Sequence, residues 1–355
     1  MLLNEDQTRQ ATIVVAGIDT HRSTHHAAVL DLQGRLLGEQ EFPVTTTGYR
    51  SLLDWVAGHG VVDRVGVELT GSYGAGLTRF LTGAGISVVE VNTTDRATRA
   101  KRGKTDVIDA IAAAQKVLTG MAESTPKNTT ATVESIRILT MVRDSAVKNR
   151  TQALNQLKDL RITAPAVLRE TLDPMSLPRL AKTAAAFRPD TTQTSNPVQA
   201  TKIGMKRLGE RVRDLDEEIA AADKDLTALV EAIAPTLIAA NGIGTHTAAR
   251  LIITAGGNPD RIHSSAAFTR LCGAAPIPVA SGKTHRMRLH RGGDRHANRA
   301  LHMIVIGRMK NHAPTQAFVQ RKLAEGKSKR DAIRALKKYV AREVFTALKT
   351  DNNLN

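Results

Sequence analysis

The chain has 355 residues, enough for two or three compact domains, and 41% of them are hydrophobic, which excludes a disordered tail. Lysine and arginine number 50 against 34 aspartates and glutamates, and the net charge of +16 predicts a polyanionic partner. No segment is apolar over the ~20 residues that a bilayer requires, and the first residues lack the charged-then-apolar order of a signal peptide. The single cysteine excludes a disulfide framework. We therefore expect a cytoplasmic protein that binds nucleic acid and no membrane.

Residues 10–128 alternate between strand and helix patterns. Three apolar segments, the last two separated by Gly34, predict a three-stranded meander at 12–18, 25–32 and 35–44. Helical and strand patterns then follow in turn: helix 49–57, strand 64–69, helix 73–82, strand 86–91 and helix 105–118. This order predicts a layered α/β domain.

Residues 129–234 are helical in pattern, with a helix at about 133–160 and a Pro/Thr-rich segment, 162–198, that we expect to be a linker. After it, apolar residues alternate spacings of four and three until Pro235: Leu208, Val212, Leu215, Ile219, Ala222, Leu226, Leu229 and Ile233. Such a heptad seam predicts a coiled coil. Its partner is either the 133–160 helix of the same chain, in an antiparallel hairpin, or a second subunit.

Residues 235–350 form a third, mainly helical region, closed by a basic amphipathic helix at about 329–348. Two apolar helical stretches flank a turn with Gly242 and Gly244, which resembles a helix–hairpin–helix motif. The second helix would offer its N–H groups to a phosphate, and the alternative is a compact turn between packed helices. Ser281 follows a Pro-punctuated loop, where a hydroxyl can be a nucleophile or a plain loop serine. We expect six basic residues around it to bind nucleic acid: Lys283, Arg286, Arg288, Arg291, Arg295 and Arg299.

Four acidic residues suggest a metal site. Asp106 and Asp109, three positions apart after the predicted N-cap Thr105, share one helix face, where they can also simply complement the helix dipole. Asp19 follows the first strand and Glu68 ends the fourth, so all four carboxylates can converge on Mg²⁺, or on Mn²⁺ as the alternative. Three basic residues just before the helix would neutralise the nucleic-acid backbone: Lys101, Arg102 and Lys104.

The segments "GID", "VELTGSYG" and "KTDVIDA" together resemble the DEDD motif of the RuvC-like domain in the insertion-sequence one-ten family of transposases, which are bridge-RNA-guided recombinases. The resemblance implies an RNase H-like fold in which Asp19, Glu68, Asp106 and Asp109 bind the metal. His21 and Arg22 follow the first aspartate, where relatives often have a lysine, so the role of that side chain is left open.

The segment "PIPVASGKTHRMRLHRGGDRHANRAL" resembles the second transposase domain of the same family, whose serine matches Ser281 and links covalently to DNA. The resemblance implies a site-specific recombinase of a mobile element with target and donor DNA, a structured bridge RNA, and a dimer or tetramer in the bacterial cytoplasm, at the nucleoid. The acids and Ser281 would form a composite site, within one chain or between subunits. Two rival hypotheses are a metal-dependent nuclease like a junction resolvase, and a non-catalytic nucleic-acid-binding protein.

Overall fold

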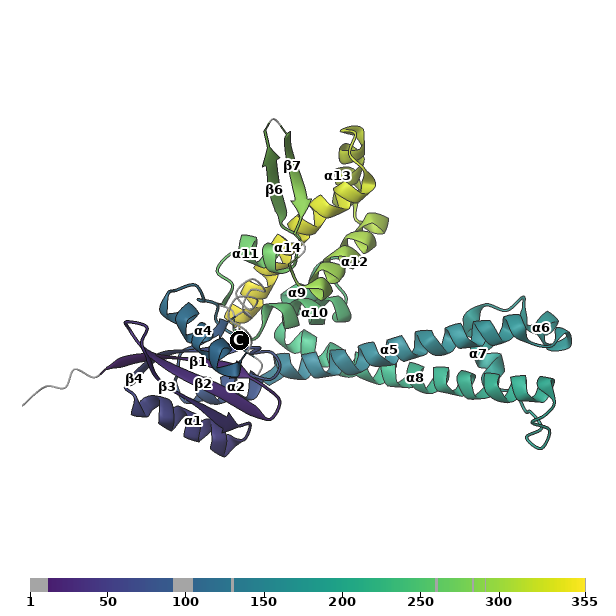
Figure 1. The fold of residues 1–355 in the computed structure, drawn as a ribbon. Helices are drawn as coiled ribbons and strands as arrows, with labels where there is room; N and C mark the ends of the chain where they lie inside the picture. The colour runs from purple at the N-terminus through teal and green to yellow at the C-terminus, as the bar shows by residue number, and fades with distance from the viewer. Residues whose placement is uncertain are drawn as a thin grey trace, which may run out of the picture. The chain divides into compact units, whose positions relative to one another are not determined.

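The computed structural model describes residues 12–91, 105–128, 131–258, 261–282, 284–290 and 292–354 (Figure 1). The chain divides into two compact units. The N-terminal unit comprises Met1–Ala131 and Ala255–His263, and the C-terminal unit comprises Thr132–Thr254 and Ser264–Asn355. The first is a mixed α/β unit and the second is mainly helical, as the sequence patterns predict.

The N-terminal unit contains a five-stranded sheet of order β3-β2-β1-β4-β5. Its strands are β1 (Ile13–Thr20), β2 (Thr24–Asp31), β3 (Leu36–Pro43), β4 (Val61–Glu68) and β5 (Val88–Val91). The first three form the predicted antiparallel meander, with Gly34 at φ +81° in its second turn, whereas β4 and β5 run parallel to β1. The carboxyl ends of β1 and β4 therefore meet at one edge of the sheet.

Helices cover both faces of this sheet. The helices α1 (Thr46–Gly58) and α2 (Ala75–Gly83) pack on one face, in a core that includes Val14, Ala16 and Ile18 of β1. The helix α4 (Asp106–Leu118) packs on the other face, in a core that includes Val15. Successive residues of β1 thus enter opposite cores, as the two-residue period of a strand requires. This burial on both faces explains the continuous apolar sequence of β1.

The second segment of the N-terminal unit, Ala255–His263, is attached by side chains. Asn258 donates a hydrogen bond from Nδ2 to the Pro126 carbonyl (2.8 Å), and Arg261 donates from Nε to the Thr125 carbonyl (3.1 Å). Burial lowers the pKa of Arg261 from its usual value. A stretch more than 120 residues downstream thereby completes the α/β unit.

The C-terminal unit begins with two long helices, α5 (Ala131–Thr163) and α8 (Pro197–Ile233), which lie side by side in a hairpin (Figure 1). Two ion pairs join them, Arg143 to Asp223 and Arg150 to Asp216. The partners increase along α5 and decrease along α8, so the helices are antiparallel. Within this chain, the helix that pairs with the heptad-bearing α8 is therefore α5, in an antiparallel hairpin.

Residues 162–198 are not the plain linker that we expected. They contain α6 (Ala166–Leu172) and α7 (Leu177–Ala185), whose Leu168, Leu172 and Leu180 are buried in a core with α5 and α8. The prolines mark where these helices start, since Pro165 is the N-cap of α6 and α7 has a proline in its first turn. A proline at a helix start costs no hydrogen bond, and it therefore does not indicate a loop.

The remaining C-terminal elements surround a long last helix. They are α9 (Pro235–Ala239), α10 (Thr245–Ala255), α11 (Ser265–Leu271), β6 (Pro276–Ser281), β7 (Thr284–Leu289), α12 (Arg295–Asn311), α13 (Ala313–Ala324) and α14 (Lys329–Leu354). The expected Pro-punctuated loop is instead a strand, and β6 pairs with β7 in a two-stranded antiparallel ribbon. Among the described residues, no helix is long and apolar enough to cross a membrane.

Candidate functional site

Two acids lie at the edge of the sheet where parallel strands β1 and β4 end. Ile18 pairs with Val67 in the register, so Asp19 and Glu68 are the next residues on their strands. Both are buried, with 6% and 3% of their surfaces exposed. Thr20 reinforces this edge by donating from its hydroxyl to the Glu68 carbonyl oxygen (3.1 Å).

The chain turns sharply after Glu68. Leu69 has φ +49°, the left-handed region that costs a residue with a Cβ about 1 kcal/mol or more. Its carbonyl accepts hydrogen bonds from the backbone N–H groups of Ser72 and Gly74. Gly74 lies so close to the backbone of Glu68 that a Cβ on Gly74 would stand 2.5 Å from the Glu68 carbonyl oxygen. Backbone strain is thus stored directly beside a candidate metal ligand, as is common at functional sites.

The other two acids lie in the first turn of α4. Thr105 is the N-cap, as the sequence predicts, and its hydroxyl accepts a hydrogen bond from the Ile108 N–H (3.3 Å). Asp106 is exposed, whereas Asp109 is only 3% exposed. Burial of a carboxylate is costly, and a residue placed only to complement the helix dipole would remain in solvent. The burial of Asp109 therefore favours a specific role over the helix-dipole alternative.

The helix α4 is held against β1 by a close backbone approach at Gly17. A Cβ at this position would stand 2.1 Å from the Ala114 nitrogen and 2.2 Å from the Ala110 carbonyl oxygen. Ala110 directly follows Asp109, and Gly17 lies two residues before Asp19. Only glycine permits this contact, which brings the first turn of α4 to the end of β1 that carries Asp19.

The side chain of His21 connects two of the acids. Its Nδ1 lies 3.6 Å from Asp19 Oδ2, and its Nε2 lies 3.8 Å from Asp106 Oδ1. One donor atom from each of the three residues falls within 4.8 Å of the others, so this group can hold a metal ion. The structure therefore brings Asp19 and Asp106 to one place, with Glu68 at the same sheet edge and Asp109 one helical turn from Asp106.

The basic residues expected to bind nucleic acid are only partly described. Lys101, Arg102 and Lys104 lie outside the described residues, as do Lys283 and Arg291 and the side chain of Arg286. Arg288 on β7 and the pair Arg295 and Arg299 on α12 are exposed. Their guanidinium groups are therefore accessible to a phosphate backbone.

Ser281 ends β6 at the tip of the ribbon. It is exposed, and its register partner across the turn is Thr284. Gly282 follows with φ +53°, a left-handed conformation that makes the tight turn feasible. The four acids belong to the N-terminal unit and Ser281 belongs to the C-terminal unit.

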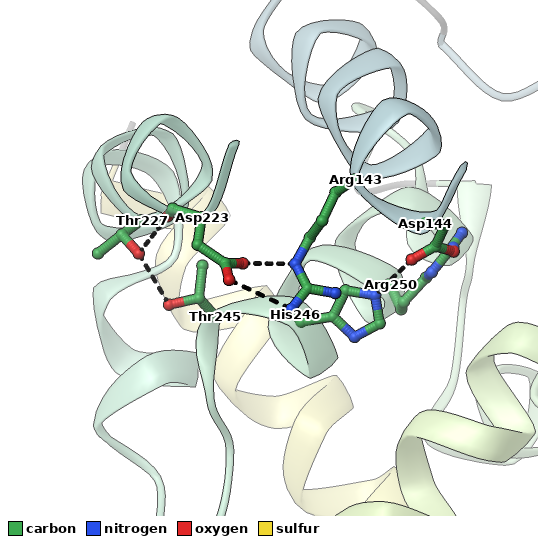
Figure 2. Close-up of polar contacts among 7 residues, drawn as sticks. All are labelled: Arg143, Asp144, Asp223, Thr227, Thr245, His246 and Arg250. Carbon is green, nitrogen blue, oxygen red and sulfur yellow. Dashed lines mark hydrogen bonds and ion pairs between the residues drawn. The ribbon is translucent and has the colours of Figure 1, made fainter. Parts of the chain in front are cut away.

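The turn with Gly242 and Gly244 leads into α10, beside a polar network that we did not predict (Figure 2). Asp144 pairs with Arg250 and lies 3.0 Å from His246, and Thr227 contacts Thr245 at 3.1 Å. Burial, together with nearby Arg143, lowers the pKa of His246.

An open pocket of about 390 Å³ lies at this turn, lined by residues that include both glycines, Arg143 and His246. The sequence does contain a signal for the neighbouring ion pairs. Arg143 and Arg150 are seven residues apart on α5, and Asp216 and Asp223 are seven residues apart on α8. Opposite charges in matching heptad positions indicate paired helices.

Two family models match the chain. One, described as a transposase, matches residues 16–161, and the other, described as "Transposase IS116/IS110/IS902 family", matches residues 234–320. The first contains all four acids and the second contains Ser281, and together they span about two thirds of the chain.

Two proteins of Streptomyces coelicolor are similar over most of their length. "Mini-circle putative transposase for IS117" is 27% identical over an aligned region that covers 77% of this chain and 78% of that protein. "Insertion element IS110 uncharacterized 43.6 kDa protein" is 23% identical over an aligned region that covers 95% of this chain and 94% of that protein. With both of its domains matched, the chain belongs to the IS110 family of transposases, enzymes that cleave and rejoin DNA.

Proposed function

We propose that this transposase is a site-specific recombinase that uses a DEDD metal centre and a serine nucleophile. The observation that supports it most is the placement of Asp19 and Glu68 at the ends of adjacent parallel strands, with Asp106 close to Asp19 across His21. The sheet order β3-β2-β1-β4-β5, with an antiparallel meander followed by parallel strands, supports an RNase H-like fold. A protein that only binds nucleic acid does not require buried acids at the ends of these strands.

The residues fit a divalent cation. Four carboxylates supply the hard oxygen ligands that Mg²⁺ prefers, and Mn²⁺ accepts the same donors. Asp19, Glu68, Asp106 and Asp109 would hold the ion, which supplies charge stabilisation at the reacting phosphate and activates an attacking oxygen. The proposed site is itself acidic and would repel DNA. The net charge of the whole chain, +16, attracts the polyanionic substrate in spite of this.

Ser281 would carry out the covalent step. Its Oγ attacks the phosphorus of a DNA phosphodiester, loses its proton, and displaces one sugar oxygen, which takes up a proton as a free hydroxyl. A hydroxyl of the second DNA strand then attacks the phosphoserine, which restores Ser281 and rejoins the strands. The exposed position of Ser281 on a narrow ribbon, and the accessible Arg288 on β7, support this role.

A structured bridge RNA would choose target and donor DNA, and the protein would act as a homo-oligomer in the bacterial cytoplasm. The α5 helix has an apolar strip that suits a subunit contact, with Ile138 and Met141 exposed at 43% and 55%. Light scattering of the purified protein, together with sequencing of co-purified RNA, tests both proposals. A monomer without bound RNA contradicts them.

The test of the chemistry is a covalent protein–DNA adduct on denaturing gels, with substrate DNA and Mg²⁺. We expect the adduct with the wild type, none with Ser281→Ala, and the adduct again with Thr284→Ala, which removes the other hydroxyl of the turn. Cleaved DNA without any adduct would instead indicate a hydrolytic nuclease. Strand transfer by Ser281→Ala at the wild-type yield would remove this serine from the mechanism.

A further inference from the structure

The imidazole of His21 lies between two carboxylates without forming a normal hydrogen bond to either. Its nitrogens are 3.6 Å from Asp19 Oδ2 and 3.8 Å from Asp106 Oδ1, whereas hydrogen bonds of this type span about 2.7–3.2 Å. The three side chains therefore surround a small space, with one donor atom from each within 4.8 Å of the others.

The main chain fixes this position of His21. The residue directly follows β1, and its N–H donates a hydrogen bond to the Thr24 carbonyl (3.1 Å) across the turn into β2. The side chain is 42% exposed, so it contributes little to the core and its removal leaves the sheet intact.

The separations suit a shared ion. First-row divalent metals bind imidazole nitrogen and carboxylate oxygen at about 2.0–2.2 Å, so two ligand atoms of one ion lie at most ~4.4 Å apart. Nδ1 of His21 and Asp19 Oδ2 are within this limit. Asp106 begins α4 and its side chain is 55% exposed, so a rotation about its side-chain bonds can complete the set.

We propose that His21 is a nitrogen ligand of the ion held by Asp19 and Asp106, and that it makes this position selective for a first-row transition ion such as Mn²⁺ over Mg²⁺. The inference rests on the proposed function, because it takes both aspartates as metal ligands. Mn²⁺ accepts imidazole nitrogen as well as carboxylate oxygen, although it binds nitrogen less strongly than the later first-row ions, whereas Mg²⁺ prefers oxygen and gives up its water reluctantly.

The experiment uses the full-length protein and Mn²⁺ as the probe. Calorimetric titration gives the affinities for Mn²⁺ and Mg²⁺, and pulsed electron paramagnetic resonance detects imidazole nitrogen coupled to bound Mn²⁺. We expect this coupling in the wild type and its loss in His21→Gln. We also expect His21→Gln to weaken Mn²⁺ binding about tenfold or more, and Mg²⁺ binding by less than about threefold.

The matched control is His26→Gln, on the neighbouring strand, which removes an imidazole paired with Glu39 and should change neither readout. Fluorescence of Trp55, the only tryptophan, checks that each variant is folded. Bound Mn²⁺ without nitrogen coupling, or coupling that persists in His21→Gln, overturns the inference but leaves the carboxylate site in place. If the wild type binds no metal, or if Asp19→Asn leaves metal binding unchanged, the proposed metal centre itself is wrong.

Discussion

Gly17 of β1 lies directly against Ala114 of α4, and a Cβ on Gly17 would stand 2.1 Å from the Ala114 nitrogen. This approach holds the helix that carries Asp106 and Asp109 against the strand that carries Asp19. The relative position of three candidate ligands therefore depends on the absence of a single methyl group.

We predict that Gly17→Ala displaces α4 and abolishes strand transfer. The overpacked contact should lower the free energy of unfolding by about 1–3 kcal/mol, measured by Trp55 fluorescence in urea. The control is Gly58→Ala at the end of α1, where a new Cβ meets nothing within 4 Å. A Gly17→Ala protein with wild-type strand transfer would show that α4 does not position the site.

We predict that Asp109→Asn reduces strand transfer by about a hundredfold or more, since the loss of groups that merely support metal ligands already costs 10- to 100-fold. Thr105→Ala provides the contrast, because it removes the helix cap and keeps both carboxylates. We expect it to lose about 1 kcal/mol of stability and little activity. Equal loss of strand transfer in both variants would favour the helix-dipole explanation of the acids.

Acid should destabilise the N-terminal unit through His25. This side chain is fully buried, stacks on Tyr49 with ring centroids 5.7 Å apart, and has no described hydrogen-bond partner at Nε2. Burial lowers its pKa from the usual 6.5. As the pH falls below 6.5, the unfolded chain binds a proton that the folded chain does not, so stability decreases.

We predict that His25→Phe keeps a buried ring stacked on Tyr49 and reduces the loss of stability as the pH falls. The measurement is urea unfolding at several pH values between about 5 and 7.5, followed by Trp55 fluorescence. His263→Gln removes an exposed imidazole from the same unit and serves as the control. An unchanged slope in His25→Phe would assign the acid sensitivity to other groups.

The C-terminal unit contains a buried cation that is paired with a carboxylate. Arg308 on α12 is 5% exposed, donates from NH1 and NH2 to the two Glu343 carboxylate oxygens of α14, and donates from Nε to the Asn241 carbonyl (2.7 Å). Glu343→Ala should cost about 2 kcal/mol, and Arg308→Met in that background should recover part of it, because the unpaired buried charge is then removed.

Urea unfolding followed by the helical circular dichroism signal measures this effect. Glu325→Ala, which breaks a surface pair with Lys322, serves as the control and should change stability little, because water screens an exposed ion pair. If the double variant, Glu343→Ala with Arg308→Met, is less stable than Glu343→Ala alone, Arg308 stabilises the protein even without its ion pair, and the expected recovery is wrong.

Much of the α/β unit could be predicted because its strands and helices have clear periodicities. The strand ends also indicated Asp19 and Glu68, since parallel neighbours bring their carboxyl ends together. The position of the His21 side chain between Asp19 and Asp106 could not be predicted, because it depends on the turn between β1 and β2, where the His21 N–H donates to the Thr24 carbonyl. A residue just outside a strand has no periodicity that shows where its side chain lies.

The C-terminal unit was harder to predict. The heptad seam of α8 specifies a partner surface but not which helix supplies it, and the ion pair between Arg143 and Asp223 decides between the two alternatives within this chain. The helices α6 and α7 were missed because Pro165 and Pro178 suggested a loop. The β6–β7 ribbon was missed because a short strand that begins with two prolines, Pro276 and Pro278, has little strand propensity of its own.

The α/β unit is built from two separate segments of the chain, because side chains of Ala255–His263 bind to the segment that carries the sheet. A truncation after Ala131 would remove the two side chains that donate to the Thr125 and Pro126 carbonyls, so we expect that fragment to be less stable than the same residues in the full-length chain. Exchange of residues 1–131 for those of a distant relative would likewise separate the Thr125 and Pro126 carbonyls from Arg261 and Asn258.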